Sequence, residues 1–126
     1  MLAIDDGVGK LIKALKDTGQ YENTLIVFGA DQGIAWGQKG FQMKLAPYDG
    51  TIRGPLIVSM PKKLPCGKVC KKPVGGADLV PTFFEAAKLQ PPWKMHGRDL
   101  TPLLNNPTDK SWKSPLLLAH TGMSFG

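Results

Sequence analysis

The chain has 126 residues, of which 42% are hydrophobic and 21% charged, a composition typical of one soluble globular domain and not of a disordered chain. Lysine and arginine outnumber aspartate and glutamate by 16 to 10, so the net charge is +6. No apolar run approaches the roughly 20 residues of a membrane-spanning helix. The acidic start of the chain, Asp5-Asp6, does not fit a signal peptide, so we expect neither a membrane segment nor an export signal in this sequence.

The first predicted element is an amphipathic helix that begins near Leu2 and stops at Gly19. Its apolar residues recur at three- and four-residue spacing, which places them on one face. They are Leu2, Ile4, Val8, Leu11, Ile12 and Leu15. Asp5 and Asp6 fall at the start of this helix, where the helix dipole favours acidic side chains, so we interpret them as helix-start residues and not as metal ligands.

Two unbroken apolar runs predict strands over residues 24–28 and 55–60. Neither run alternates with polar residues, which is typical of strands buried on both faces of a parallel sheet. The segment 33–54 between them contains five glycines and shows little periodicity. Such a long connection is usually functional, and this one leaves the carboxyl end of a strand, where open α/β sheets bind their ligands.

The second half of the chain predicts a helix from Asp78 to about Lys88, with Asp78 as its N-cap. The side chains expected to face the core are those of Leu79, Phe83, Ala86 and Ala87. A short turn or helix over residues 100–104 follows. A strand over residues 115–119, running into His120, completes the pattern.

These elements predict an α/β fold with a mostly parallel sheet flanked by helices, in a single domain over residues 1–126. Both faces of these strands are apolar and need to be buried, and the predicted helices are too few to bury them. We therefore expect the chain to be part of a larger domain. Its exposed apolar flank would pack against the missing segment or against a second copy of the chain.

A basic loop rich in proline and glycine covers residues 61–76. Its lysines are Lys62, Lys63, Lys68, Lys71 and Lys72, with no acidic residue between Pro61 and Pro73. Such a stripe indicates either a solvated loop or a polyanion site, and the lack of aromatic residues argues against nucleic acid. Cys66 and Cys70 in this loop lack the further ligands of a structural zinc site, and both a local disulfide and free thiols stay open.

Four segments in a fixed order make the chain recognisable. They cover residues 23–33, 44–55, 78–82 and 96–100. In the first, a buried strand ends in Asp31-Gln32-Gly33, and in the second, Lys44 precedes Tyr48 by four residues. In this order and spacing the segments resemble the sulfatases of the alkaline-phosphatase-like superfamily. The resemblance covers nearly the whole chain and implies that family's fold and its metal-dependent hydrolysis of sulfuric esters.

The resemblance also implies the roles of individual residues. Asp31 and Gln32 would be metal ligands, and Lys44 would contact the sulfate group. Carboxylate and amide oxygens suit Ca²⁺ or, alternatively, Mg²⁺, and a lysine ammonium suits a sulfate oxygen. Lys39 stands where many relatives carry histidine, which makes it a candidate substrate contact. The two histidines, His96 and His120, have no carboxylate or cysteine at ligand spacing, so we interpret them as ordinary core or surface residues.

The nucleophile segment of the sulfatases has no counterpart in this sequence. That segment is Cys-x-Pro-x-Arg or Ser-x-Pro-x-Arg, in which the first residue is oxidised to formylglycine, and neither Cys66 nor Cys70 fits it. The resemblance therefore implies the C-terminal part of a sulfatase catalytic domain, inactive alone, whose parent enzyme acts on a sulfate ester. Relatives are often periplasmic, secreted or lysosomal, and the sequence itself assigns no compartment.

Two alternatives stay open. One is a fragment of a phosphonate or phosphodiester hydrolase of the same superfamily, which would share much of the 31–55 segment. The other is a non-catalytic anion-binding module that uses the lysines of the basic loop. Such a module would bind polyanions with an affinity that falls steeply with salt and that does not depend on Asp31.

Overall fold

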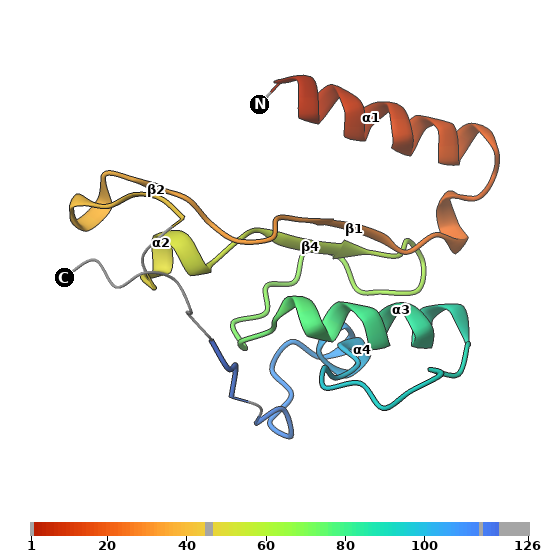
Figure 1. Ribbon diagram of the computed structural model, residues 1–126. Coiled ribbons are helices and arrows are strands. Elements are labelled where there is room, and N and C mark those ends of the chain that lie inside the picture. The colour runs from red at the N-terminus through yellow and green to blue at the C-terminus, as the bar shows by residue number, and fades with distance from the viewer. Residues whose placement is uncertain (1, 45–46, 114, 119–126) are drawn as a thin grey trace.

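The computed structural model places a small sheet between helices (Figure 1). It describes residues 2–44, 47–113 and 115–118. In chain order the elements are α1 (Leu2–Asp17), the 3-10 helix η1 (Tyr21–Asn23), β1 (Ile26–Gly29), β2 (Ala35–Trp36), the 3-10 helix η2 (Gln38–Gly40), β3 (Gln42–Met43), α2 (Asp49–Ile52), β4 (Leu56–Ser59), the 3-10 helix η3 (Gly76–Asp78), α3 (Leu79–Ala87) and α4 (Thr101–Asn105).

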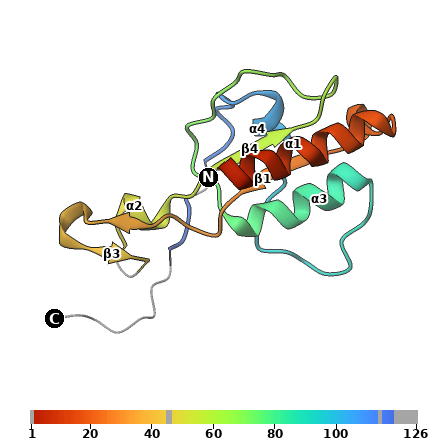
Figure 2. The same ribbon diagram turned by 90° about the horizontal axis from the view of Figure 1, so that it is seen from above.

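Strands β1 and β4 lie between two layers of helices. Helix α1 covers one face of this pair, and α3 and α4 lie on the other side (Figure 1). Seen from above, α1 runs along the two strands (Figure 2). A second pair, β2 and β3, forms an arm that projects away from these layers and carries α2 at its base (Figures 1 and 2).

Helix α1 ends as the sequence predicts. Gly19 adopts a left-handed conformation with φ of 70°, which a residue without a side chain reaches at little cost. The amide of Gly19 then donates to the carbonyl of Lys16, and the amide of Gln20 donates to that of Leu15. This double closure satisfies carbonyls that the helix end would leave unpaired. No helix in the described part of the chain is both long and apolar enough to cross a membrane.

The predicted mostly parallel sheet is wrong for the described residues, because both strand pairs are antiparallel. Ile26 lies opposite Ser59, and Gly29 lies opposite Leu56. The reason is the path of the connection, which leaves β1, forms the arm and enters β4 at the same edge of the sheet. A parallel partner would need a crossover to the opposite edge. An apolar run without alternation indicates that both faces of a strand can be buried, but it gives no information about the direction of the strand relative to its neighbour.

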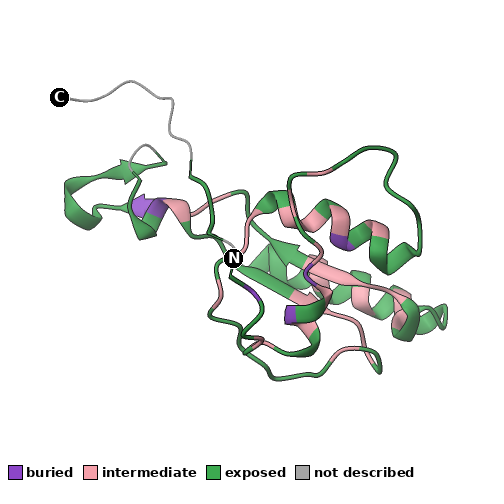
Figure 3. Cartoon of the chain, turned by 90° about the horizontal axis from the view of Figure 1, so that it is seen from below, coloured by how far each residue is buried: buried purple, intermediate pink, exposed green. Residues whose placement is uncertain are grey.

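The buried core lies beneath the sheet, among α3, α4 and the segment that follows α4. Leu100, Leu103 and Trp112 are buried, and Figure 3 shows how few positions of the chain reach this class. The Trp112 indole Nε1 donates to the carbonyl of Pro73 at 3.2 Å, so the core also fixes the end of the basic loop. Helix α1 contributes no buried residue, and its Leu11 is 69% exposed.

The predicted core face of the 78–88 helix is partly wrong. The helix forms as α3, but Phe83 is 43% exposed and the buried side chain is that of Thr82. The hydroxyl of Thr82 donates to the carbonyl of Asp78 at 2.6 Å and accepts from the amide of Leu100 at 2.9 Å. The helix therefore turns a polar side chain inward, because the segment beneath it presents a backbone amide that needs a partner.

Asp78 does not cap α3 with its side chain. Its carboxylate instead accepts from the amides of Gly75 and Arg98, at 2.9 and 2.8 Å. Gly97 lies so close to this point that a Cβ atom there would come within 1.8 Å of the carbonyl oxygen of Ala77. The 78–82 and 96–100 segments are thus one packed unit, held by a carboxylate, a hydroxyl and a glycine.

The last predicted elements have different outcomes. The short helix over 100–104 is confirmed as α4. Residues 115–118 form no strand, and Leu116 instead packs against Gly75, where an added Cβ would lie 2.6 Å from its Cδ1. An apolar segment becomes a strand only where a neighbouring edge accepts its backbone hydrogen bonds. Ala119 and His120, which the prediction included, lie outside the described residues.

Candidate functional site

Residues 31–33, here called the Asp31 turn, follow the end of β1 at the edge of the sheet where β4 starts. The chain leaves the sheet between Ala30 and Pro55, whose amide and carbonyl join at 3.2 Å. The amide of Gln32 donates back to Asp31 Oδ1 at 2.8 Å, which holds the carboxylate over the turn. The Asp31 side chain is 75% exposed, so its oxygens are accessible to a ligand.

Lys44 reaches this turn from the other end of the arm. Strands β2 and β3 pair Ala35 with Met43 and Trp36 with Gln42, so the chain folds back on itself and ends beside its starting point. The Lys44 ammonium Nζ then donates to both carboxylate oxygens of Asp31, at 2.8 and 2.9 Å. Asp31 and Lys44, two of the candidates that the resemblance implies, therefore lie in contact, while their roles stay a prediction.

The electrostatics of the turn favour an ionised carboxylate. The hydrogen bond from Lys44, followed by that from the Gln32 amide, lowers the pKa of Asp31 below its ordinary value of 3.8. The Gln32 side chain lies at the same turn, and its Nε2 donates to the carbonyl of Lys44 at 3.4 Å. One carboxylate, one amide oxygen and one ammonium thus lie together in this structure.

Helix α2 supports the turn from behind. The amide of Gly33 donates to the carbonyl of Thr51 at 2.9 Å, and Thr51 is buried. A Cβ atom on Gly33 would come within 2.4 Å of the carbonyl oxygen of Gly50 and 2.5 Å of that of Arg53. Only glycine allows this approach, so Gly33 is required by packing and not merely by the flexibility of a loop.

Lys39 lies apart from the Asp31 turn. It sits at the tip of the arm in a left-handed conformation, and its ammonium lies 4.4 Å from the centre of the Tyr48 ring. The Phe41 ring packs against Tyr48 with 5.3 Å between ring centres. These residues border a hollow of about 470 Å³. The structure gives Lys39 an aromatic partner, and its candidate role in substrate binding stays a prediction.

The remaining candidates form no further centre. His96 is exposed in the turn before Gly97, and His120 lies outside the described residues. Cys66 and Cys70 are both free and exposed. Within residues 2–44, 47–113 and 115–118, no group of three or more His, Cys, Asp or Glu side chains could hold a metal ion.

Comparison with known proteins identifies the family. The family model named Sulfatase matches residues 1–89. An N-acetylglucosamine-6-O-sulfatase of Bacteroides thetaiotaomicron is 33% identical over 115 residues, which are 90% of this chain and 21% of that protein. The human N-acetylglucosamine-6-sulfatase is 33% identical over 97% of this chain, and arylsulfatase K of Xenopus laevis is 36% identical over 95% of it. This chain spans 22% of the length of each of the latter two relatives.

Solved structures carry the same fold. One is a protein in complex with its substrate D-glucosamine-2-N,6-O-disulfate, with a TM-score of 0.78 and 34% identity, covering 84% of this chain and 22% of that one. Another is a phosphonate monoester hydrolase from Silicibacter pomeroyi, with a TM-score of 0.79 and 34% identity over 87% of this chain and 22% of that one. The predicted partial α/β fold of the alkaline-phosphatase-like kind is thereby confirmed. The family match, the identities above 30% and the shared fold agree, and this chain belongs to the sulfatase family.

Proposed function

We propose that this chain forms part of the active centre of a sulfuric-ester hydrolase, in which Lys44 binds the sulfate group and Asp31 and Gln32 bind the metal ion. The observation that carries the proposal is the contact of the Lys44 ammonium with both oxygens of Asp31, across 13 residues of chain. The contact brings an exposed carboxylate and an exposed ammonium to one point at the edge of the sheet, which supports a role for both side chains at one bound group.

The donor atoms of the turn fit a hard cation. A carboxylate and an amide oxygen are the ligand types that Ca²⁺ prefers, and Mg²⁺ is the alternative. In the described structure the Gln32 Nε2 is engaged with the carbonyl of Lys44, which leaves the amide oxygen for a ligand. Ca²⁺ takes six to eight oxygens, so other parts of the enzyme would complete the set. The ion, when bound, would stabilise negative charge on the sulfuryl oxygens.

Lys44 would orient the anion and would not transfer a proton. Its side chain is 45% exposed, and its flexible stem lets the ammonium contact both Asp31 and an anion placed beside it. A sulfate oxygen next to Lys44 would offer the ammonium a second negatively charged partner beside the Asp31 carboxylate. The carboxylate and the anion would thus share one cation, which favours binding of the ester beside the metal ligands.

The chain alone should not hydrolyse sulfate esters. The sequence contains no Cys-x-Pro-x-Arg or Ser-x-Pro-x-Arg segment, and Cys66 and Cys70 lie in the basic loop without that pattern. Without the nucleophile, Lys44 can only position an anion. The described part of the turn also supplies two of the six to eight oxygens of a calcium site, so we expect Ca²⁺ affinity in the millimolar range or weaker.

The test combines an activity assay with a binding readout. The purified chain is incubated with a chromogenic aryl sulfate and Ca²⁺, and its backbone amide spectrum is followed by NMR during a Ca²⁺ titration. We expect no turnover, and shifts at residues 31–33 that disappear in Asp31→Ala. Asp17→Ala is the matched control, because Asp17 is an exposed aspartate paired with Lys13 on α1. Shifts that survive Asp31→Ala, or turnover that this variant abolishes, would overturn the proposal.

A second candidate reaction is the hydrolysis of phosphonate monoesters. The observation that favours it is the phosphonate monoester hydrolase among the structural neighbours, with a TM-score of 0.79. A phosphonate monoester also presents tetrahedral anionic oxygens to Lys44. Comparing kcat/KM for an aryl sulfate and for an aryl phosphonate monoester in the enzyme that contains this chain distinguishes the two, and sulfatase is the reaction that we expect to be faster.

A further inference from the structure

Five lysines crowd the basic loop, and the structure divides them into two groups. Lys62 pairs with Glu22 at 2.7 Å, and Lys63 donates to the side chain of Asn23 at 2.7 Å, so both fasten the loop to η1. Lys72 donates to the carbonyl of Trp112 at 3.4 Å. Lys68 and Lys71 have no hydrogen-bond or ion-pair partner among the described residues. Their charges therefore remain available for a ligand.

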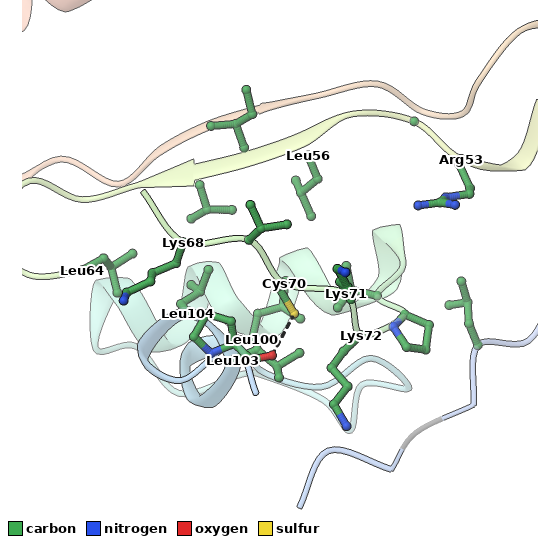
Figure 4. A pocket seen from close by; sticks show the side chains of 18 of the residues that line it. Arg53, Leu56, Leu64, Lys68, Cys70, Lys71, Lys72, Leu100, Leu103 and Leu104 are labelled. Carbon is green, nitrogen blue, oxygen red and sulfur yellow. Dashed lines mark hydrogen bonds between the residues drawn. The ribbon is translucent and has the colours of Figure 1, made fainter. Parts of the chain in front are cut away.

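Lys68 and Lys71 border a cavity of about 890 Å³, beneath β4 and beside α4 (Figure 4). Arg53 lines the same cavity, and in Figure 4 it stands on the opposite side from Lys68, with Lys71 between them. The apolar lining includes Leu56, Leu64, Leu100, Leu103 and Leu104. Among the described residues of the lining, Asp49 is the one carboxylate and is paired with Arg53 at 3.3 Å, while Arg53, Lys68, Lys71 and Lys72 all carry positive charge. The rim of the cavity is therefore cationic and its floor apolar.

The cavity adjoins the Asp31 turn without being part of it. Gly54, the residue after Arg53, lies so close to the turn that a Cβ there would be 3.1 Å from the carbonyl oxygen of Ala30 and 3.3 Å from Gln32. From Arg53 the cavity extends under β4 toward Lys68. A ligand held by these cations would thus approach the edge of the sheet where Lys44 lies.

We propose that Arg53, Lys68 and Lys71 form a binding site for a sulfated saccharide chain, separate from the site at which its ester would be cleaved. Three cations spread around one cavity match a polymer with spaced anionic groups better than one compact anion. All three cations are exposed, so water screens each single ion pair and binding depends on several of them acting together. The cavity volume falls in the range of ligand sites, about 300–1,000 Å³. The choice of a sulfated chain over other polyanions rests on the proposed function.

Nucleic acid is the polyanion that the lining disfavours. Proteins that bind single strands combine cations with aromatic side chains on which bases stack, and among the described residues no aromatic side chain lines this cavity. Saccharide chains need no such platform, because their sulfate groups bind cations directly and their rings contact apolar surface. The lining of the cavity therefore favours a saccharide partner, and the test below includes nucleic acid as a competitor.

The test measures affinity of the whole chain for a fluorescent heparin-derived octasaccharide in the absence of Ca²⁺. With three cations engaged, the affinity should fall about 20- to 40-fold between 50 and 200 mM salt, by the slope of counterion release. Lys68→Glu/Lys71→Glu should weaken binding by about tenfold or more, and Lys68→Arg/Lys71→Arg should retain it. Lys10→Glu/Lys94→Glu is the matched control, because it makes the same charge change at exposed positions outside the cavity lining.

Each outcome decides the proposal. It is overturned if both Glu double variants weaken binding equally, or if the octasaccharide does not bind to the natural chain. It is also overturned if an unsulfated hyaluronan octasaccharide or a twelve-nucleotide thymidine strand binds as tightly. Failure of this site and failure of the proposed function are therefore distinguishable, because only the latter is read from Ca²⁺-dependent shifts at residues 31–33.

Discussion

The Asp31 carboxylate receives two hydrogen bonds from one ammonium, a geometry that fixes both side chains although both are accessible to water. Because Lys44 holds the pKa of Asp31 below 3.8, the pair stabilises the fold at any pH above that value. This contribution is lost as the pH falls through the lowered pKa. Exposure keeps it small, since water and salt screen exposed ion pairs.

Replacing Lys44 by methionine should raise the pKa of Asp31 toward 3.8, because the variant removes the largest cause of the lowered pKa. The measurement is an NMR titration of the Asp31 side chain between pH 2 and 6. Lys39→Met is the control, since Lys39 lies over Tyr48. A pKa of Asp31 that is the same in Lys44→Met and in the natural chain would show that the pair does not form in solution.

Two glycines give a matched pair of substitutions with opposite signs. Gly33→Ala should destabilise the chain by about 1–3 kcal/mol, since its Cβ would press on the carbonyl oxygens of Gly50 and Arg53. Gly9→Ala should stabilise it by about 1 kcal/mol, because Gly9 lies within α1 and nothing is within 4 Å of its added Cβ. Urea unfolding measures both, and equal effects of the two substitutions would contradict the close packing at Gly33.

At the scale of elements, α3 is joined to the start of α4 by a side chain. Thr82→Val keeps the shape of the side chain and leaves the amide of Leu100 buried without a partner. We expect a loss of about 1–3 kcal/mol in the free energy of unfolding. Thr108→Val is the control, because the Thr108 hydroxyl is exposed and bonds only the nearby side chain of Asn106. Equal losses in the two variants would show that the contact with α4 does not contribute.

The elements themselves were largely predictable from the sequence. The helical period of residues 2–15, the stop at Gly19 and the short helix after Asp99 are all confirmed. The strand positions were also found, but their direction was not, because hydrophobic runs carry no information about the route between them. Strands β2 and β3 have two residues each, too few for any period to show.

The candidate site was predictable in part. The family spacing singled out Asp31 and Lys44, and the structure places them in contact. Thr51, whose carbonyl holds the Gly33 amide, was not singled out. The hydrogen bond that the Leu100 amide donates to the Thr82 hydroxyl was not predicted either. The two residues are 18 positions apart, and the spacing of neighbouring residues gives no information about such a contact. The only sequence feature that pointed to this contact was that the family motifs at 78–82 and 96–100 occur together.

At the scale of the whole molecule, much apolar surface is left uncovered. Leu2 and Leu11 on α1 are 82% and 69% exposed, and Ile57 on β4 is 61% exposed. Exposed apolar patches mark surfaces that pack against other protein. The expectation of an apolar flank thus agrees with the described residues, and its partner is open to experiment.

The isolated chain should self-associate through α1. Sedimentation velocity should show a concentration-dependent shift to larger species, which Leu2→Gln/Leu11→Gln reduces because it removes the most exposed apolar side chains of the helix. Lys10→Gln/Lys13→Gln is the control on the polar face of the same helix. A monodisperse, cooperatively melting monomer of the natural chain at high concentration would contradict this prediction.

The hydrogen bond between the Ala30 amide and the Pro55 carbonyl closes the base of the arm. Everything from Asp31 to Gly54 therefore starts and finishes at one point of the sheet. Chain between two such fixed ends can lengthen at little entropic cost, about 0.6 kcal/mol for each doubling of its length. The segment that holds Asp31, Gln32 and Lys44 can thus differ in length between relatives without altering the register of β1 and β4.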